Sequence, residues 1–416
     1  MAFIEVIGGK HLHGEVNIQG SKNAVLPILA ASVLNKGITK LNHCPRITDI
    51  FSMIKILESV GCIIYWEGDS ILINTKNLNS SVVSEQYVST MRSSIILMGA
   101  LLGRMRCVTI SYPGGCSIGA RPIDLHLKAL TELQVEVVEK NGLIYCSTTK
   151  IQGNHIVLDF PSVGATENVI LASVLAEGVT TLDNAAREPE IIELCKFLRL
   201  MGASIAGEGS EHIVIKGVHE LHDSEYTMVA DRIVMGTYMS ALAGVGGDIT
   251  LRGNCCFEQN ATIEIMKKLG CRVGLGKDYF NICSYERPRA IELVETKPYP
   301  GFPTDMQSQL MSILTVASGY SVIYETIFEG RFKNVIELRK MGANIEVKGN
   351  VSLIQGVKEL NGAEIMAYDL RGGAALIIAG LMAHDKTIVH GIEHIERGYE
   401  NISRDLRLLG ADIQVI

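Results

Sequence analysis

The sequence repeats one pattern six times, and this repeat constrains the fold more than any other feature. In each copy a helix-like stretch ends at one residue and alternating strand-type residues follow; the ending positions are Gly61, Gln134, Gly202, Gly270, Gly342 and Gly410. Successive endings lie 68 to 73 residues apart. A glycine in the left-handed conformation is typical of a helix end. We therefore predict six units of about 70 residues, and because Gln134 is not a glycine we expect its helix to end differently.

A stretch of small and apolar residues, opened by polar ones, precedes each ending. The six stretches are SKNAVLPILAASVL, TMRSSIILMGALLG, GATENVILASVLAEG, DRIVMGTYMSALAGVGG, PTDMQSQLMSILTVASG and DLRGGAALIIAGLMA. They are apolar nearly all round, which predicts buried helices. Each unit is then strands, buried helix, strands, outer helix and strand, a βαβαββ-type repeat. We predict an α/β (α+β) fold of two lobes, each an inside-out barrel with threefold pseudo-symmetry, three central helices and outer sheets.

The two lobes are expected to meet near residues 225–230, where the polar segment 219–228 is a candidate linker. The first strand, FIEVIGG, lies outside the unit that starts near Gly20. We expect it to pair with the last unit, so that the two termini lie together.

Composition excludes several classes of protein. With 38 Lys and Arg against 45 Asp and Glu, the net charge is −7, so no overall electrostatic attraction to nucleic acid exists. The longest apolar run, 24–34, is too short to span a membrane. The ten cysteines form no C-x-x-C pair, so zinc-site spacing is absent and no metal site is expected. The N-terminus does not resemble a secretory signal, which favours a cytoplasmic protein with reduced thiols.

Cationic residues gather at the predicted helix starts, in a protein that is acidic overall. Lys22, Arg92, Arg232 and Arg371 lie at or beside the starts of buried helices. Arg121 and Arg397 each lie 13 residues before an ending, where an outer helix is expected to start. Helix N-termini attract anions, and if the lobes face each other these ends converge on one cleft. The pattern indicates a phosphate or carboxylate ligand.

A glycine-rich loop, YPGGCSIGARP, carries the residue with the most distinctive chemistry. Gly114, Gly115 and Gly119 surround Cys116, and Arg121 follows. Such a loop suits a lid, and nearby cations favour the thiolate. The alternative is an incidental loop cysteine. The segment is not a P-loop, since G-x-x-x-x-G-K-[ST] is absent.

Other candidates have structural alternatives of comparable weight. Lys22 and Asn23 can bind a phosphate, or cap a helix with the lysine in solvent. Asp305 can act as a base, or only stabilise the first turn of its helix. Arg371 and Arg397 can bind a carboxylate, or form surface salt bridges. The histidines show no metal-like spacing.

These residues resemble the enolpyruvyl transferase family, and within it the UDP-N-acetylglucosamine 1-carboxyvinyltransferases. The resemblance covers essentially the whole chain and rests on GSKNAVLPILAA, MRSSI, PGGCSIGARPIDLH, FPSVGATEN, NAAREPEI, PYPGFPTDMQ, DLRGGAAL and HIERGYENI. It implies two lobes that close over the substrates. The first lobe is 22–229, and the second is made of 1–21 and 230–416.

The resemblance implies transfer of the enolpyruvyl group of phosphoenolpyruvate to the 3-hydroxyl of UDP-N-acetylglucosamine, the first committed step of peptidoglycan synthesis. Cys116 is then the general acid and Asp305 the proposed base. Lys22 and Arg397 are implied to be catalytic as well, and together with Arg121 they hold the phosphate and carboxylate of phosphoenolpyruvate, with Arg371 nearby. Asn23 is implied to orient the reacting groups. The nucleotide-sugar site is implied to be lined by Arg92, Arg121, Pro122, Ile123, Asp124, Leu125, Ser162, Val163, Gly164 and Ile327. No metal or cofactor is implied, and the partners are these two small molecules, with no nucleic acid and no membrane.

Three positions depart from the family pattern. Gly330 precedes Arg331 where an asparagine is common, which puts a contact of Arg331 in doubt; Val234 replaces an acidic residue; and Phe160-Pro161 precede Ser162 where some members carry a lysine. Three alternatives remain: the related transferase that uses shikimate 3-phosphate, which lacks the cysteine loop, a non-catalytic ligand-sensing paralogue, and a structural repeat scaffold.

Overall fold

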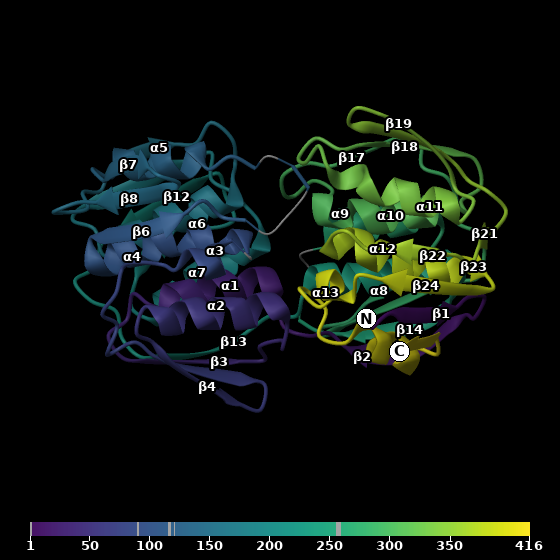
Figure 1. Ribbon diagram of the computed structural model, residues 1–416, viewed down its shortest axis with the longest axis horizontal. Helices are drawn as coiled ribbons and strands as arrows, with labels where there is room; N and C mark the ends of the chain where they lie inside the picture. Colours follow the sequence, from purple (N-terminus) through teal and green to yellow (C-terminus); the bar gives the residue numbers. More distant parts are fainter. Residues whose placement is uncertain (1, 90, 115–117, 120, 255–258) are drawn as a thin grey trace. The chain divides into compact units, whose positions relative to one another are not determined.

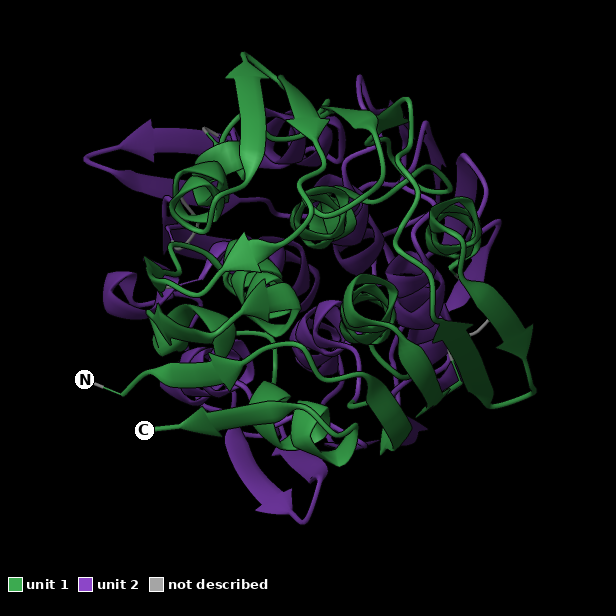
Figure 2. Cartoon of the chain, turned by 90° about the vertical axis from the view of Figure 1, so that its right-hand side faces the viewer, with its two compact units in different colours: residues 1–19, 117–120, 230–416 green, residues 20–116, 121–229 purple. Residues whose placement is uncertain are grey.

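The computed structural model of the protein describes residues 2–89, 91–114, 118–119, 121–254 and 259–416. The chain divides into two compact units, coloured separately in Figure 2. Unit 1 comprises Met1–Gln19, Ser117–Ala120 and Ala230–Ile416, and unit 2 comprises Gly20–Cys116 and Arg121–Val229. Each unit has its own hydrophobic core.

Unit 2 contains three sheets, with strand orders β13-β3-β5-β4, β6-β8-β7 and β11-β12-β10-β9. Its strands are β3 (Ile38–Asn42), β4 (Ile63–Glu67), β5 (Ser70–Asn74), β6 (Cys107–Ser111), β7 (Glu136–Lys140), β8 (Leu143–Ser147), β9 (His155–Val157), β10 (Val179–Asp183), β11 (Ser204–Ala206), β12 (His212–Lys216) and β13 (Ser224–Thr227). Its helices are α1 (Lys22–Ser32), α2 (Thr48–Ser59), α3 (Glu85–Val88), η1 (Arg92–Ile96), α4 (Leu97–Met105), α5 (Asp124–Glu132), α6 (Val163–Ser173) and α7 (Pro189–Leu200).

Unit 1 repeats this plan with four-stranded sheets ordered β22-β24-β1-β25, β15-β16-β14-β2 and β17-β18-β20-β19, and a short pair β21-β23. Its strands are β1 (Ile4–Ile7), β2 (Leu12–Asn17), β14 (Gly247–Arg252), β15 (Arg272–Leu275), β16 (Tyr279–Ser284), β17 (Val294–Glu295), β18 (Tyr320–Tyr324), β19 (Asn344–Lys348), β20 (Val351–Gln355), β21 (Leu360–Asn361), β22 (Glu364–Met366), β23 (Ala383–His384), β24 (Lys386–His390) and β25 (Asp412–Val415). Its helices are α8 (Arg232–Val245), α9 (Asn260–Leu269), η3 (Thr304–Met306), α10 (Gln307–Leu314), η4 (Arg331–Asn334), α11 (Val335–Lys340), α12 (Leu370–Met382), α13 (Ile392–Ile395) and α14 (Ile402–Leu408).

The six predicted central helices are confirmed. They are α1, α4 and α6 in unit 2 and α8, α10 and α12 in unit 1, and nearly every residue of each is buried. Small residues allow close packing: α4 contacts α6, and an added Cβ at Gly99 would lie 2.4 Å from the Asn168 carbonyl oxygen. Figure 1 shows the helices of unit 1 between its outer sheets. The α/β repeat fold predicted from the sequence is therefore correct.

All six outer helices end in the same way, which makes the expectation for Gln134 wrong. Gln134 adopts φ 63°, as the glycines at the other endings adopt φ 89° to 105°. Its N–H donates to the Thr131 carbonyl and the next N–H, of Val135, donates to Leu130. Gly61 and Cys62 make the same two bonds, to Glu58 and Leu57. These two hydrogen bonds satisfy carbonyl groups of the last helical turn, and they hold a glutamine in the left-handed region.

The chain termini lie together, as the sequence predicted. Strand β1 pairs antiparallel with both β24 and β25, so Ile4 lies between Val389 and Val415. The expected linker 219–228 is in part wrong, because its residues 224–227 form β13, which pairs parallel with β3. The polar residues there suit an edge strand. Among the described residues, no helix combines the length and apolar character that a membrane span requires.

Candidate functional site

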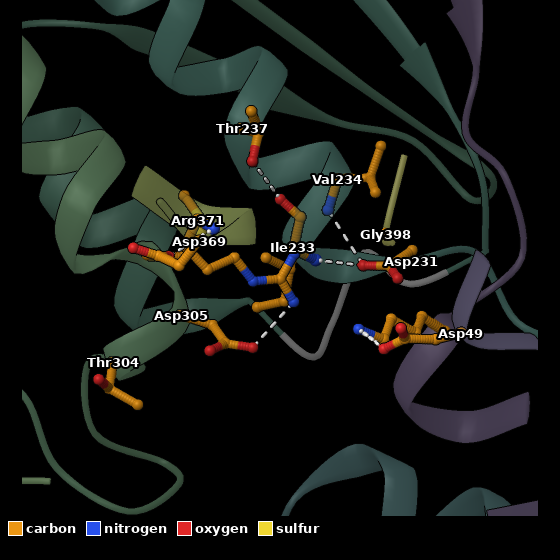
Figure 3. Close-up of polar contacts among 12 residues, drawn as sticks. Asp49, Asp231, Ile233, Val234, Thr237, Thr304, Asp305, Asp369, Arg371 and Gly398 are labelled. Carbon is orange, nitrogen blue, oxygen red and sulfur yellow. Dashed lines mark hydrogen bonds and ion pairs between the residues drawn. The ribbon is translucent and has the colours of Figure 1, made fainter. Parts of the chain in front are cut away.

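Lys22 begins α1 and lies buried against Asp49 in the first turn of α2. The Lys22 Nζ is 2.6 Å from the Asp49 Oδ2, and the two side chains are 10% and 4% exposed. Figure 3 labels Asp49 and draws its ion pair as a dashed line. A buried ammonium needs a counter-charge because desolvation is costly. The alternative of a solvated capping lysine is therefore wrong, and Asp49 is a functional candidate that the sequence did not reveal.

Arg92 and Arg121 form a cationic corner of unit 2. The Arg92 Nη2 donates to the carbonyl of Pro122 at 3.0 Å, which joins the start of η1 to the segment before α5. Burial lowers the pKa of Arg92 to about 10, and repulsion by Arg121 adds to the effect. Arg121 itself adopts φ 45°. Two partly buried guanidinium groups that repel each other favour an anion beside them.

A buried neutral histidine, His126, lies near Arg92 and Arg121. Burial, with repulsion from Arg92 and Arg121, lowers the pKa of His126 to about 3. The Asn168 Nδ2 donates to its Nδ1 at 2.7 Å, so the ring carries its proton on Nε2. The ring also packs on Gly164, where an added Cβ would lie 2.8 Å from Cε1.

Ser162, Val163 and Gly164 form the start of α6. Ser162 is the N-cap residue, and its Oγ accepts from the Ala165 N–H at 3.4 Å. Unit 2 therefore places the predicted nucleotide-sugar residues of η1, the segment before α5 and α6 around His126. Of that segment, Ile123 is buried, whereas Asp124 and Pro122 are exposed.

Asp305 is held by two arginines in unit 1. Its Oδ2 accepts from the Arg371 Nη2 at 2.9 Å, drawn in Figure 3, and its Oδ1 accepts from the Arg331 Nη2. Both guanidinium groups are buried, at 5% and 4% exposure, while the Asp305 side chain is 26% exposed. Burial disfavours the charge on Arg371, but the combined attraction of Asp305, Tyr399 and Asp231 outweighs burial and raises the pKa of Arg371. The surface-salt-bridge alternative for Arg371 is wrong.

Gly330, which departs from the family pattern, directly precedes Arg331 and leaves its bond to Asp305 intact. The N–H of Gly330 donates to the Ile118 carbonyl at 2.8 Å. An added Cβ at Gly330 would lie 2.7 Å from the carbonyl carbon of Ile118. The missing side chain admits the backbone of Ile118.

Two of the central helices in unit 1 are capped by their own aspartates. Asp231 accepts from the N–H groups of Ile233 and Val234 (Figure 3). Asp369 accepts from those of Arg371 and Gly372. The expectation that helix N-termini are open to an anion is thus wrong for α8 and α12, whose first N–H groups already bind a carboxylate.

The remaining predicted residues take the following positions. Asn23 is half-buried in the first turn of α1, and Ile327 lies in the loop after β18. Arg121 precedes α5 by three residues and Arg397 precedes α14 by five, so neither starts its helix as expected. Cys116 lies outside the described residues.

Comparison with known proteins decides the family. The sequence matches the EPSP synthase family, described as 3-phosphoshikimate 1-carboxyvinyltransferase, over residues 6–406. The chain belongs to this family. It is 49% identical over 413 residues, 99% of both chains, to UDP-N-acetylglucosamine 1-carboxyvinyltransferase 2 of Caldanaerobacter subterraneus subsp. tengcongensis. It is 43% identical, again over 99% of both chains, to UDP-N-acetylglucosamine 1-carboxyvinyltransferase of Thermodesulfovibrio yellowstonii.

Solved structures agree on the fold. The enolpyruvyl transferase NikO from Streptomyces tendae superposes with a TM-score of 0.89 at 22% identity, covering 100% of this chain and 98% of the other. EPSP synthase from Acinetobacter baumannii gives a TM-score of 0.77 at 18% identity, covering 100% and 99%. At these identities the likeness concerns the architecture alone, which matches the repeat predicted from the sequence.

Proposed function

We propose that the protein transfers the enolpyruvyl group of phosphoenolpyruvate to the 3-hydroxyl of UDP-N-acetylglucosamine in the cytoplasm, releasing phosphate. The observation that carries this proposal is the full-length identity of 43–49% with relatives that bear the name of this activity. The loop PGGCSIGARP supports it against shikimate 3-phosphate as the acceptor. In this proposal the protein catalyses the first committed step of peptidoglycan synthesis.

The residues of unit 2 are suited to polyanionic substrates. Lys22 supplies an ammonium for the phosphate of phosphoenolpyruvate, with Asn23 beside it in α1. Arg92 and Arg121, whose mutual repulsion an anion would relieve, fit the diphosphate of the nucleotide sugar. The segment from Arg121 to Leu125 and the Ser162–Gly164 turn would surround its uridine and sugar.

The residues of unit 1 are suited to the reacting groups. Asp305 is partly exposed, and would accept a hydrogen bond from the sugar 3-hydroxyl. Both of its oxygens already bind arginine, which weakens it as a base, so orientation of the hydroxyl is its main proposed task. Arg371 and Arg397 would bind the carboxylate and phosphate of phosphoenolpyruvate, and Ile327 would contact the nucleotide sugar.

The proposed reaction adds and then eliminates. Cys116 donates a proton to C3 of phosphoenolpyruvate, and the bond from the sugar oxygen to C2 forms as the hydroxyl passes its proton to Asp305. The Cys116 thiolate then takes a proton from C3, the bond from C2 to the phosphate oxygen breaks, phosphate leaves and the enolpyruvyl ether remains. Acid–base catalysis contributes about 10²- to 10⁴-fold, with the rest from orientation and preorganised charge.

A phosphate-release assay tests the proposal directly. The purified protein is incubated with phosphoenolpyruvate and either UDP-N-acetylglucosamine or shikimate 3-phosphate. We expect release of phosphate only with the nucleotide sugar. Release only with shikimate 3-phosphate would overturn the acceptor, and no release with either acceptor would favour a non-catalytic paralogue.

A further inference from the structure

Glu325 is a buried carboxylate that the proposed mechanism does not use. It follows β18 directly and is 2% exposed. Four hydrogen bonds converge on it. Its Oε1 accepts from the Thr296 Oγ1 at 2.9 Å and from the N–H groups of Ile327 and Phe328 at 2.8 and 3.1 Å, and its Oε2 accepts from the Thr304 Oγ1 at 2.9 Å. A carboxylate satisfied so completely has one fixed orientation.

The bond to Thr304 connects Glu325 to Asp305. The Thr304 hydroxyl has one proton, which it donates to Glu325, so its oxygen faces the Arg331 Nε as an acceptor at 3.1 Å. The other end of that guanidinium donates to Asp305. Because an arginine fork is planar, fixing its Nε–H also fixes the direction in which Nη2 points. Thr304 and Asp305 share the turn η3 as well.

The other oxygen shapes the loop after β18. By accepting from two successive N–H groups, Glu325 holds the backbone of Ile327 and Phe328 in one conformation. Ile327 is the residue of this loop that the proposed function assigns to the nucleotide sugar. One carboxylate thus touches both the support of Asp305 and the loop of Ile327.

We propose that Glu325 is a positioning residue for the acceptor substrate, which acts through Thr304 and Arg331 on Asp305 and through the backbone on Ile327. This inference rests on the proposed function. It states that the network orients the sugar hydroxyl and does not merely stabilise unit 1. Loss of the network should therefore raise the KM for UDP-N-acetylglucosamine more than the KM for phosphoenolpyruvate.

Threonine variants separate positioning from stability. Thr304→Val removes the hydroxyl at nearly constant volume, and Thr304→Ser restores it. Thr315→Val is the matched control, because the buried Thr315 hydroxyl donates to the Ser312 carbonyl in the same unit and has no bond to this network. We expect kcat/KM for UDP-N-acetylglucosamine to fall about 10-fold or more in Thr304→Val, with the serine variant and the control within about twofold of the parent.

Changes to Glu325 itself should affect both the path through Thr304 and Arg331 to Asp305 and the backbone conformation at Ile327. Glu325→Gln replaces one acceptor oxygen by a donor, which opposes the existing donors. We expect a raised KM for UDP-N-acetylglucosamine together with a lower kcat, and a KM for phosphoenolpyruvate within about twofold of the parent. Glu346→Gln is the matched exposed control, since the exposed Glu346 in β19 forms an ion pair with the exposed Lys348 at 3.0 Å. Unchanged kinetics in folded Thr304→Val and Glu325→Gln proteins would overturn the proposal.

A second readout does not depend on turnover, so failure of the proposed function can be recognised separately. In NMR spectra of protein labelled with ¹⁵N-arginine, the Nε–H signal of Arg331 is identified by its absence from the spectrum of Arg331→Lys. Hydrogen exchange at this group should be about 10-fold or more faster in Thr304→Val than in the parent or in Thr304→Ser. Equal exchange rates would contradict the relay even in a protein that transfers no enolpyruvyl group.

Discussion

At the scale of single residues, burial decides what each charged group can do. Lys22 and Asp49 approach to 2.6 Å with almost no exposure, whereas Lys128 and Asp159 approach to the same 2.6 Å at 57% and 64% exposure. Water screens the second pair, and the protein interior does not screen the first. The two pairs therefore have the same geometry and very different energetic weight.

Asp49→Asn should destabilise unit 2 strongly. The substitution leaves the Lys22 ammonium buried without its counter-charge, and we expect a loss of about 3 kcal/mol in the free energy of unfolding, measured by urea titration. The control is Asp159→Asn, which breaks the exposed pair and should cause no measurable change. Equal effects of the two substitutions would contradict the argument.

Cys116→Ala should abolish turnover. Under the proposed function, we expect the variant also to lose the adduct that the thiol-alkylating epoxide fosfomycin forms at Cys116 of the parent protein. Burial raises the pKa of Cys44, Cys62, Cys146 and Cys195 to about 12, so these thiols stay protonated and unreactive. Intact-mass spectrometry checks this prediction, and Cys44→Ala is the control that should keep the adduct. Full activity in Cys116→Ala would refute its role.

His126 should make the stability depend on pH. Its pKa is about 3 in the folded chain and about 6.5 when unfolded, so below pH 6.5 the unfolded state binds an extra proton. The stabilisation is therefore complete above pH 6.5 and is lost as the pH falls toward 3. Between pH 7.5 and pH 5 we expect a loss of about 2 kcal/mol from this group.

The variant His126→Gln isolates this contribution. A glutamine keeps an acceptor for Asn168 but does not titrate, so the urea-measured stability should change less between pH 7.5 and pH 5 than in the parent. The difference between the two slopes cancels the other titrating groups. Identical slopes would show that His126 is not the source of the pH dependence.

At the scale of elements, the helix endings show what the sequence could and could not predict. The recurring glycines predicted the helix ends and the repeat, because left-handed backbone has a clear residue signature. Gln134 gave no such signal, and only its bonds to the helix carbonyls reveal that it adopts the same conformation. Repeat position was the better guide at this residue than residue type.

In the candidate site, too, the repeat predicted some residues, and only the folded structure revealed others. The positions of Lys22, Arg92 and Asp305 at helix starts followed from the repeat. The buried acids near them did not, since Asp49 beside Lys22 and Glu325 beside Thr304 are ordinary acidic residues until the fold buries them. Pairing across sequence-distant elements has no local pattern from which it can be predicted.

Gln134→Gly should stabilise the protein. A glutamine in the left-handed region is strained, and glycine removes the strain at the cost of a more flexible unfolded chain, so we expect a gain of about 0.5–1 kcal/mol by urea titration. Gly410→Ala is the reverse test: φ is 89° there, and the nearest atom to an added Cβ lies 3.9 Å away. It should lose about 1 kcal/mol from backbone strain alone.

At the scale of the whole molecule, chain order and structural membership differ. The first 19 residues belong to unit 1 although the next segment builds unit 2. Strand β1 fills the centre of the sheet β22-β24-β1-β25, and β2 forms an edge of the sheet of β14. Unit 1 is therefore complete only after the N-terminal segment and the C-terminal half of the chain have met.

Deleting residues 2–7 should unfold unit 1 and leave unit 2 folded. The deletion removes the central strand β1, which leaves the edges of β24 and β25 unpaired and exposes the apolar face that Ile4 and Val6 cover. The sequence contains one tryptophan, Trp66, which lies in β4 of unit 2 with the Arg46 guanidinium 4.3 Å from its ring centre. Tryptophan fluorescence should therefore keep its native spectrum while far-ultraviolet circular dichroism loses a large part of its signal. Loss of both signals together would mean that unit 2 depends on unit 1 for its stability, and retention of both would mean that β24 and β25 hold their sheet without the strand between them.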